Sequence, residues 1–319
     1  MRRWSICLIL SVFISANASA QEPIPGAKKV VFLGDSITHG GQYISYFETE
    51  LRLSQPRREI EILNLGLPSE TVSGLSEDGH AGGKFPRPDL HERLDRVLEK
   101  TQPDLIFACY GMNDGIYLPL DGERTKKYRQ GLMRLRDKAE KAGIKVIHLT
   151  PAVFDTLPIK PRLATAEKAD GNHPYEKYDQ VLDHYSQWLL ERRKDGWKVV
   201  DLHFPMRDAL AEARKKNPTF KYAGDGVHPN LDGQVTMGRA LLRGLDPNFK
   251  LDDPVHGAFA DSKSKRAELF KLIDQRNRIL RDAWLTHTGH KRPMTAGLPL
   301  DQAQAKAAPI NEAIRMLLK

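Results

Sequence analysis

The order of apolar and amphipathic segments limits this chain to few folds. Short runs of β-branched and other apolar residues alternate with longer stretches whose apolar residues recur at helical spacing. The runs that predict strands are 29–33, 60–65, 104–110, 145–149 and 197–202. The stretches that predict helices are 42–53, 89–100, 126–142, 175–194, 206–216 and 232–242. We therefore expect an α/β protein built from consecutive strand–helix–strand units.

Such units also predict where ligands bind. Each strand–helix–strand unit makes a right-handed crossover, so the strands form one parallel sheet with helices on both faces. In sheets of this kind, ligands bind beyond the carboxyl ends of the strands. The loops that follow the strands are therefore the places to look for reactive side chains.

The first twenty residues have the pattern of a secretory signal peptide. Arg2 and Arg3 precede an apolar run over 4–14, and small residues follow up to an A-x-A cleavage pattern that ends at Ala20. The apolar run is too short for a membrane span, which needs about 20 residues. We expect cleavage near Ala20 and export to the periplasm or the extracellular space, without stable membrane insertion. Retention as an uncleaved anchor stays open.

Cysteine content and charge exclude further classes. Once the signal segment is removed, Cys109 is the only cysteine, so an internal disulfide is excluded and a hydrophobic core must stabilise the fold. The net charge of +8 falls to +6, because that segment carries two Arg and no acid. Acidic and basic residues are interleaved in the rest of the chain, and we find no nucleic-acid motif. We therefore expect no nucleic-acid partner.

The carboxyl-terminal part differs from the rest. From residue 251 on, the sequence predicts two helices, 261–286 and 300–319, and no further strand. Twelve Lys and Arg against eight Asp and Glu place most of the net charge there. We expect a domain over 21–250 and a helical extension over 251–319. Whether the extension covers the sheet edge, caps the ligand crevice or mediates oligomerisation stays open, and so does the oligomeric state.

A serine follows the first predicted strand. The strand runs into Gly34-Asp35-Ser36, which places the Ser36 hydroxyl at the carboxyl edge of the sheet. In isolation, this pattern is more typical of a helix cap than of a nucleophile. Asp225-Gly226-Val227-His228 lies in a loop near the end of the domain. A hydroxyl needs a base to become nucleophilic, and the base needs an orienting carboxylate, so Ser36, His228 and Asp225 supply all three roles.

Two further loops offer hydrogen-bond donors for an oxyanion. The second strand ends at Gly66, whose backbone N–H can approach a ligand closely, and the third is followed by Asn113 with its side-chain amide. Stabilisation of a tetrahedral oxyanion contributes a few kcal/mol for each such donor. We expect Ser36 N–H, Gly66 N–H and Asn113 to form the oxyanion hole.

Together, these loops resemble the four signature blocks of the SGNH or GDSL hydrolase superfamily, in the family's order, over residues 28–245. The resemblance implies a three-layer α/β/α, flavodoxin-like fold with a five-stranded parallel sheet in the order 2-1-3-4-5, and the predicted helical extension follows the part of the chain that it covers. It implies a serine esterase in which Ser36 is the nucleophile, His228 the base and Asp225 its orienter. It implies neither a cofactor nor a metal.

The long loop after the second strand predicts part of a substrate site. His80, Phe85 and Arg87 lie in this loop, and we expect Phe85 to stack on a sugar ring and Arg87 to bind a carboxylate or a sulfate. Tyr110 and Asp114 flank Asn113 and are further candidates for substrate binding. The alternative is a surface loop whose Pro and Gly residues only shape its path.

Export favours extracellular polymers or lipids as substrates, and we find no long apolar stretch that would form an acyl-chain tunnel. We therefore favour hydrolysis of short-chain acyl esters, such as acetyl groups on a small-molecule or polysaccharide carbohydrate. A lysophospholipase or thioesterase acting on lipids is the alternative. A catalytically inactive glycan-binding module is a third reading, which the presence of all the reactive residues disfavours.

Overall fold

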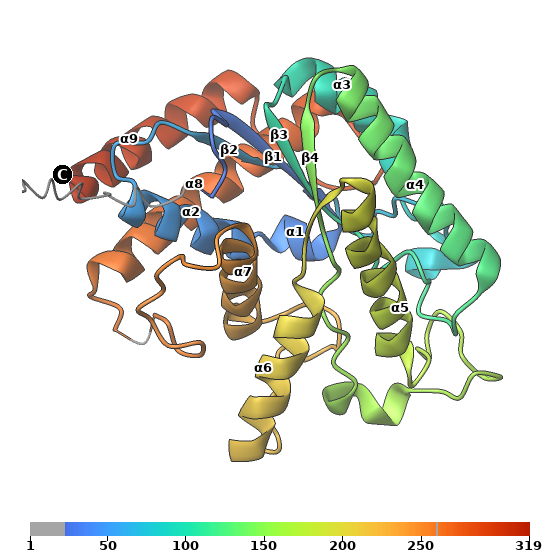
Figure 1. Cartoon of the computed structure of the whole chain (residues 1–319). Helices are drawn as coiled ribbons and strands as arrows, with labels where there is room; N and C mark the ends of the chain where they lie inside the picture. The colour runs from blue at the N-terminus through green and yellow to red at the C-terminus, as the bar shows by residue number, and fades with distance from the viewer. Residues whose placement is uncertain (1–22, 260) are drawn as a thin grey trace, which may run out of the picture.

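A computed structural model describes residues 23–259 and 261–319, so the predicted signal peptide lies outside the described residues. Five parallel strands form one sheet in the order β2-β1-β3-β4-β5 (Figure 1). Their bounds are β1 Lys29–Gly34, β2 Glu61–Asn64, β3 Leu105–Cys109, β4 Lys145–Leu149 and β5 Lys198–Val200. The predicted α/β fold and its strand order are confirmed.

The middle of the sheet is the centre of the core. Residues Val30 to Leu33 of β1 are 0% exposed, as expected for a strand that is covered on both faces. Phe32 of β1 stacks on Phe107 of β3 with ring centroids 4.7 Å apart. Cys109, at the end of β3, is buried with a free thiol and packs as a small core residue.

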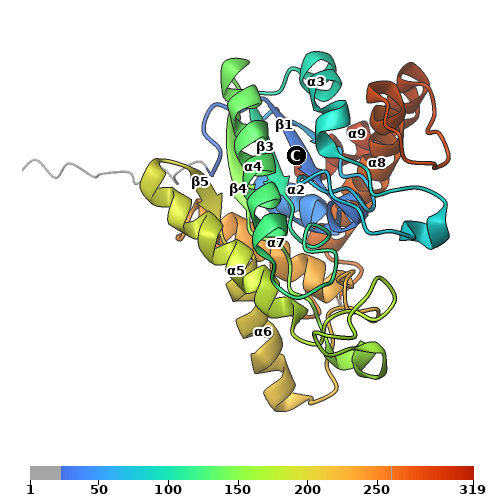
Figure 2. The same ribbon diagram turned by 90° about the vertical axis from the view of Figure 1, so that its right-hand side faces the viewer.

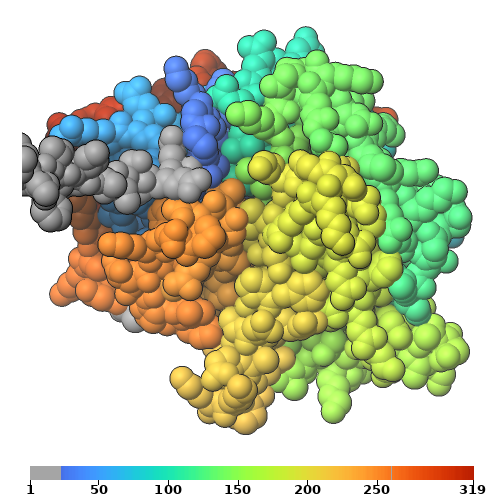
Figure 3. All heavy atoms as spheres, in the orientation of Figure 1, coloured from blue at the N-terminus to red at the C-terminus, as the bar shows by residue number. Residues whose placement is uncertain are grey.

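Helices cover both faces of the sheet (Figure 1). One layer contains α2 and α7, and the other contains α3, α4 and α5, with α6 beside α5 and α7. Their bounds are α1 Ser36–Gly40, α2 Gln42–Ser54, α3 Leu90–Thr101, α4 Gly122–Lys141, α5 Tyr178–Glu191, α6 His203–Lys216 and α7 Leu231–Leu245. The carboxyl end of α6 projects from the body of the molecule (Figure 3).

The starts of α4 and α5 differ from the predicted ones for local reasons. Helix α4 begins before the predicted start, because the Asp121 side chain accepts a hydrogen bond from Arg124 N at 2.8 Å and caps its first turn. Helix α5 begins only at Tyr178, because the preceding residues form a loop closed by an isolated bridge between Ala164 and Tyr175. A side-chain cap and a loop bridge leave a weaker signal in the sequence than the regular spacing of apolar residues does.

The carboxyl-terminal extension folds back onto the sheet. Helix α8 (Lys265–Thr288) packs against α2 and the edge strand β2, and α9 (Leu300–Leu318) packs on α8. Buried ion pairs join the layers: Arg276 pairs with Glu48, and Arg266 Nε lies 2.8 Å from Glu50 Oε1. Of the three roles left open by the sequence, the structure shows that the extension covers the sheet edge. Among the described helices, none has both the length and the apolar character needed to cross a membrane.

Candidate active site

Ser36 is the first residue of α1, directly beyond the carboxyl end of β1. The Asp35 side chain caps this short helix by accepting a hydrogen bond from Ile37 N at 2.9 Å. Gly34 allows the close approach of strand and helix, because a Cβ atom there would lie 2.2 Å from Thr38 Oγ1 and 2.7 Å from the Cys109 carbonyl. Burial raises the pKa of Asp35 to about 7, so this carboxyl group is only partly ionised at neutral pH.

Ser36, His228 and Asp225 form one chain of hydrogen bonds. Ser36 Oγ lies 2.8 Å from His228 Nε2, and His228 Nδ1 lies 2.6 Å from Asp225 Oδ2. The other carboxylate oxygen, Asp225 Oδ1, accepts bonds from the backbone N–H groups of Val227 and His228. The backbone of this short loop therefore holds the Asp225 carboxylate in place, and the carboxylate in turn orients the imidazole ring of His228. Residues 192 positions apart in the sequence meet here, as the sequence predicted.

The charges in this chain suit a histidine base. The hydrogen bond to Asp225 raises the pKa of His228, although partial burial of the ring opposes this shift. Burial tends to raise the pKa of Asp225, but the bonds from His228 and Val227 outweigh it and hold this pKa well below its ordinary value. Because Asp225 stays ionised, His228 Nδ1 carries the proton that it shares with the carboxylate. The Nε2 lone pair is then free to accept the Ser36 proton.

The side chains of His228 and Asp225 are about half exposed, at 52% and 50%. Their reactive atoms therefore lie at an open surface. Two hollows of about 590 and 320 Å³ lie elsewhere, one between α4 and α5 and one beside α5, and no residue of the serine site lines either of them.

Gly66 lies against α1, but its N–H is already engaged. The Gly66 N–H donates to Asn64 Oδ1 at 2.9 Å, and Asn64 Nδ2 donates to the Thr38 carbonyl at 2.7 Å. A Cβ atom at residue 66 would lie 2.4 Å from His39 N, so glycine is required by the close approach of α1. In this structure Gly66 therefore packs α1 against β2, and its N–H does not serve as the free donor that the sequence predicted.

Asn113 is 3% exposed and held from both ends of its amide. Its Oδ1 accepts a hydrogen bond from the Tyr117 hydroxyl at 3.0 Å, and its Nδ2 donates to the Glu70 carbonyl at 3.1 Å. An amide nitrogen carries two hydrogens, so the second N–H stays available for a ligand oxygen. The orientation of this predicted donor depends on the hydroxyl of Tyr117.

Tyr110 and Asp114 are not surface residues of a pocket. The Tyr110 hydroxyl donates to Glu70 Oε2 at 2.7 Å, and Asp114 Oδ1 accepts from Val72 N and Ser73 N, both at 2.9 Å. Both side chains are buried, with exposures of 1% and 0%. They hold the loop after β2 against the loop after β3, which is a different role from the predicted contact with substrate.

The side chains of His80, Phe85 and Arg87 contact other protein groups. Arg87 forms two hydrogen bonds to Glu77, at 2.6 and 2.7 Å, and His80 Nδ1 lies 3.1 Å from the same carboxylate. The His80 ring meets the edge of the Phe85 ring at 5.4 Å. Glu77 therefore already occupies the guanidinium group of Arg87, which the sequence predicted to bind a substrate anion. Phe85 stays half-buried beside it.

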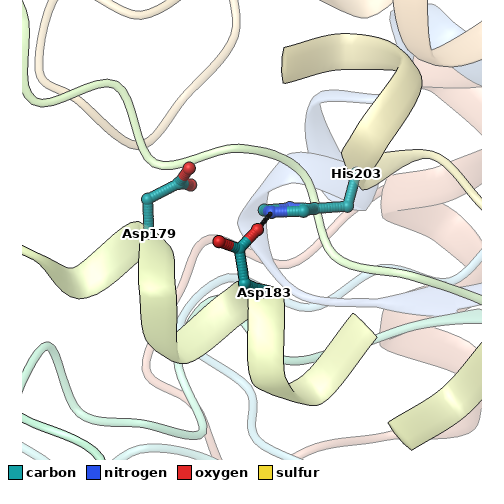
Figure 4. Close-up of side chains that lie close together, drawn as sticks. All are labelled: Asp179, Asp183 and His203. Atoms are coloured by element: carbon teal, nitrogen blue, oxygen red, sulfur yellow. Dashed lines mark hydrogen bonds and ion pairs between the residues drawn. The ribbon is translucent and has the colours of Figure 1, made fainter. Parts of the chain in front are cut away.

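A second histidine–aspartate pair lies between α5 and α6 (Figure 4). His203 Nε2 lies 2.9 Å from Asp183 Oδ1, and Asp179 approaches the same point. These three side chains have the ligand types of a metal site. However, Arg207 Nη1 also donates to Asp183 Oδ1 at 2.7 Å, and His203 Nδ1 faces the Pro151 carbonyl at 3.3 Å. Arg207 already pairs with the Asp183 carboxylate, and both ring nitrogens of His203 already face protein oxygens, so the cluster fits a hydrogen-bond network better than a metal centre.

Two residues near the site, Asn64 and Ser69, were given no role from the sequence. Asn64 tethers α1 through its bond to the Thr38 carbonyl. Ser69 has a positive φ of 67° in a turn closed by a bond from Glu70 N to the Leu67 carbonyl. A non-glycine residue in this conformation is strained and is typical of functional loops. Pro68 directly before Ser69 is the one signal in the sequence that favours such a turn.

Comparisons with known proteins agree with this fold. A model described as the GDSL-like Lipase/Acylhydrolase family matches residues 32–235. No curated protein matches the chain. A gut microbial diltiazem-metabolizing enzyme is similar in structure, with 21% identity and a TM-score of 0.55 over 71% of this chain and 49% of that enzyme, so the chain spans about half of its length.

Acetylxylan esterases also match at lower similarity. A catalytic mutant from Geobacillus stearothermophilus has 20% identity and a TM-score of 0.49, over 69% of this chain and 94% of that protein. A second acetyl xylan esterase has 23% identity and a TM-score of 0.47, over 67% and 97% of the two chains.

Proposed function

The chain belongs to the GDSL-like lipase/acylhydrolase family, which implies a carboxylic ester hydrolase, and from this premise we propose that it is a serine esterase using Ser36, His228 and Asp225. The observation that carries the proposal is the continuous hydrogen-bond chain, 2.8 Å from Ser36 Oγ to His228 Nε2 and 2.6 Å from His228 Nδ1 to Asp225 Oδ2. The described site contains every group that the reaction needs.

The reaction proceeds in two steps. In the first, His228 Nε2 takes the Ser36 proton while Oγ attacks the ester carbonyl, and the same proton then passes to the departing alcohol. In the second, His228 removes a proton from water, the hydroxide attacks the acyl-enzyme, and the proton returns to Ser36 as the carboxylic acid leaves. Asp225 compensates the charge of the imidazolium in both steps.

We assign the oxyanion to two donors. The Ser36 N–H belongs to the first residue of α1, where a backbone N–H has no partner inside the helix. The second donor is the free N–H of Asn113 Nδ2, which Tyr117 holds in orientation. Gly66 N–H is bound to Asn64, so we place it beside the oxyanion hole as a packing residue.

The exposure of the site supports small acyl groups on a polar substrate. Since His228 and Asp225 are half exposed, an acetylated sugar reaches Ser36 from solvent without entering a tunnel. A lysophospholipid or thioester with a long chain would need an apolar channel that begins at Ser36. The two hollows described above do not provide it, because no residue of the serine site lines them. We propose export of the protein on the basis of its amino-terminal sequence pattern, and mass analysis of the mature amino terminus tests it.

A panel of esters tests the function. It runs from acetylated sugars and polysaccharides through p-nitrophenyl esters of increasing acyl length to lysophospholipid, with Ser36→Ala as the inactive control. We expect kcat/KM to be highest for acetyl esters and to fall as the acyl chain lengthens. Higher activity on long-chain lipids would favour the alternative. An inactive glycan-binding module would hydrolyse nothing and would not react with a fluorophosphonate at Ser36.

A further inference from the structure

The segment after α8 returns to the loop that follows β2. Helix α8 ends at Thr288, and Arg96 of α3 holds this end by hydrogen bonds to the carbonyl oxygens of Thr288 and Gly289, at 2.9 and 3.2 Å. Four residues after the helix end, the guanidinium of Arg292 lies over the Phe85 ring, 5.1 Å from its centroid. Figure 2 shows the loop containing Phe85, in cyan, on the same side of the molecule as the dark red carboxyl-terminal helices.

Helix α8, which leads into this segment, contacts the helix that carries Ser36. Arg281 of α8 donates to the carbonyl oxygen of His39, one helical turn after Ser36, at 2.7 Å. Burial lowers the pKa of His39 to about 4, and the positive charges of Arg281 and Arg292 add to this effect. Arg292 acts in the same sense on His80 of the loop. The Arg292 guanidinium therefore lies on the loop that follows β2, in the segment after the helix that is bonded to α1.

Arg292 differs from its neighbours because it has no carboxylate partner among the described residues. Its contacts are the Phe85 ring and a hydrogen bond from Nη1 to the Pro293 carbonyl, at 3.2 Å, while its buried Nε has no hydrogen-bond partner. Burial is the single influence on the pKa of Arg292, and it lowers it. Arg87, in the same region, is paired twice with Glu77.

A partly desolvated guanidinium without a counter-charge is costly, and an anion that docks on it recovers this cost. The planar fork of arginine matches the oxygens of a carboxylate or a sulfate, with which it forms charge-assisted hydrogen bonds. The cation–π contact with Phe85 holds the fork in place before a ligand arrives.

We propose that Arg292 binds a carboxylate or sulfate group of the sugar whose ester Ser36 attacks. The carboxyl-terminal extension then does more than cover the sheet edge, because it supplies the residue that makes the enzyme selective for acidic sugar esters. This inference rests on the proposed esterase function. It also moves the anion-binding role that the sequence predicted for Arg87 to a residue more than 200 positions further along the chain.

The test compares three acetylated monosaccharides: a neutral hexoside, the corresponding hexuronide and a sulfated hexoside. We expect kcat/KM to be about 10- to 100-fold higher for an acidic ester than for the neutral one, because a charge-assisted bidentate contact contributes a factor of about this size to binding. Arg292→Ala should bring this ratio close to one by raising the KM for the acidic ester. Arg292→Lys should restore part of the preference for the acidic ester. The hexuronide and the sulfated hexoside show which of the two anions is preferred.

The neighbouring exposed cation provides a matched control. Lys291→Ala removes the same charge one position away, and we expect the acidic-to-neutral ratio to stay as in the wild type. Equal rates on all three esters by the wild type would overturn the inference and leave the esterase function standing. An equal fall for acidic and neutral esters in Arg292→Ala, together with a lower Tm, would show a structural role instead. Absence of turnover on every ester, with no fluorophosphonate labelling, would overturn both proposals.

Discussion

Two histidine–aspartate pairs, one in the loop before α7 and one between α5 and α6, differ in what the second ring nitrogen faces. In His228–Asp225, the second nitrogen faces the Ser36 hydroxyl, and the pair is half exposed. In His203–Asp183, the second nitrogen faces the Pro151 carbonyl, the ring is 0% exposed, and Arg207 shares the carboxylate. The comparison teaches that an aspartate orients a histidine in either case, but the pair becomes a base only where its free nitrogen meets a proton donor.

Removal of the base should give the largest effect. His228→Ala or Ser36→Ala is expected to lower kcat by about four to six orders of magnitude, because base and nucleophile act as a unit. The measurement is ester hydrolysis with the best acetyl ester, and circular dichroism shows whether the variants are folded. Retention of a tenth of the wild-type rate by either variant would exclude this pair as the catalytic one.

Loss of the orienting carboxylate should give a smaller effect with a distinctive pH signature. Asp225→Asn is expected to lower kcat by about 10²- to 10⁴-fold, because the imidazole loses its orientation and its counter-charge. His228 works as a base only when neutral, so activity rises with pH through its pKa, which Asp225 raises. In Asp225→Asn the carboxylate no longer raises the pKa of His228, so the acidic limb of the pH–rate profile should move to lower pH. An acidic limb at the same pH as in the wild type would contradict the influence of Asp225 on the pKa of His228.

The buried pair should affect stability and leave catalysis nearly unchanged. His203→Ala removes a ring whose two nitrogens face Asp183 and the Pro151 carbonyl, and we expect it to destabilise the fold by about 2–4 kcal/mol. The free energy of unfolding comes from urea titration. The rate per active site, counted by fluorophosphonate labelling, should stay within about twofold. A loss of rate comparable with that of Asp225→Asn would remove the distinction between the two pairs.

The smallest effect is expected from metal removal. Because Arg207 already pairs with Asp183 and both ring nitrogens of His203 already face protein oxygens, treatment with EDTA should change neither the rate nor the Tm, and added Zn²⁺ or Mg²⁺ should not raise the Tm. A Tm that falls with EDTA and recovers with one cation would instead identify Asp179, Asp183 and His203 as ligands.

Much of the site could be predicted because its residues lie at the ends of strands. Apolar runs such as Val30 to Leu33 fix the strands, and a parallel sheet brings their carboxyl ends to one edge. Ser36 and His228 were therefore expected to meet. The roles of Gly66 and Arg87 were not predictable in this way, because Asn64 and Glu77, which occupy their donors, are neither periodic nor part of a motif.

The sequence by itself determined the sheet and, through the family resemblance, its strand order, and it predicted Ser36, His228 and Asp225 as the reactive side chains. Only the tertiary structure decided which polar groups stay free: it pairs Arg87 with Glu77 and leaves Arg292 without a carboxylate partner among the described residues. The physical reason is that strand and helix patterns are local and repeat along the chain. The partner of a charged side chain depends instead on atoms brought together from distant positions, such as Phe85 and Arg292.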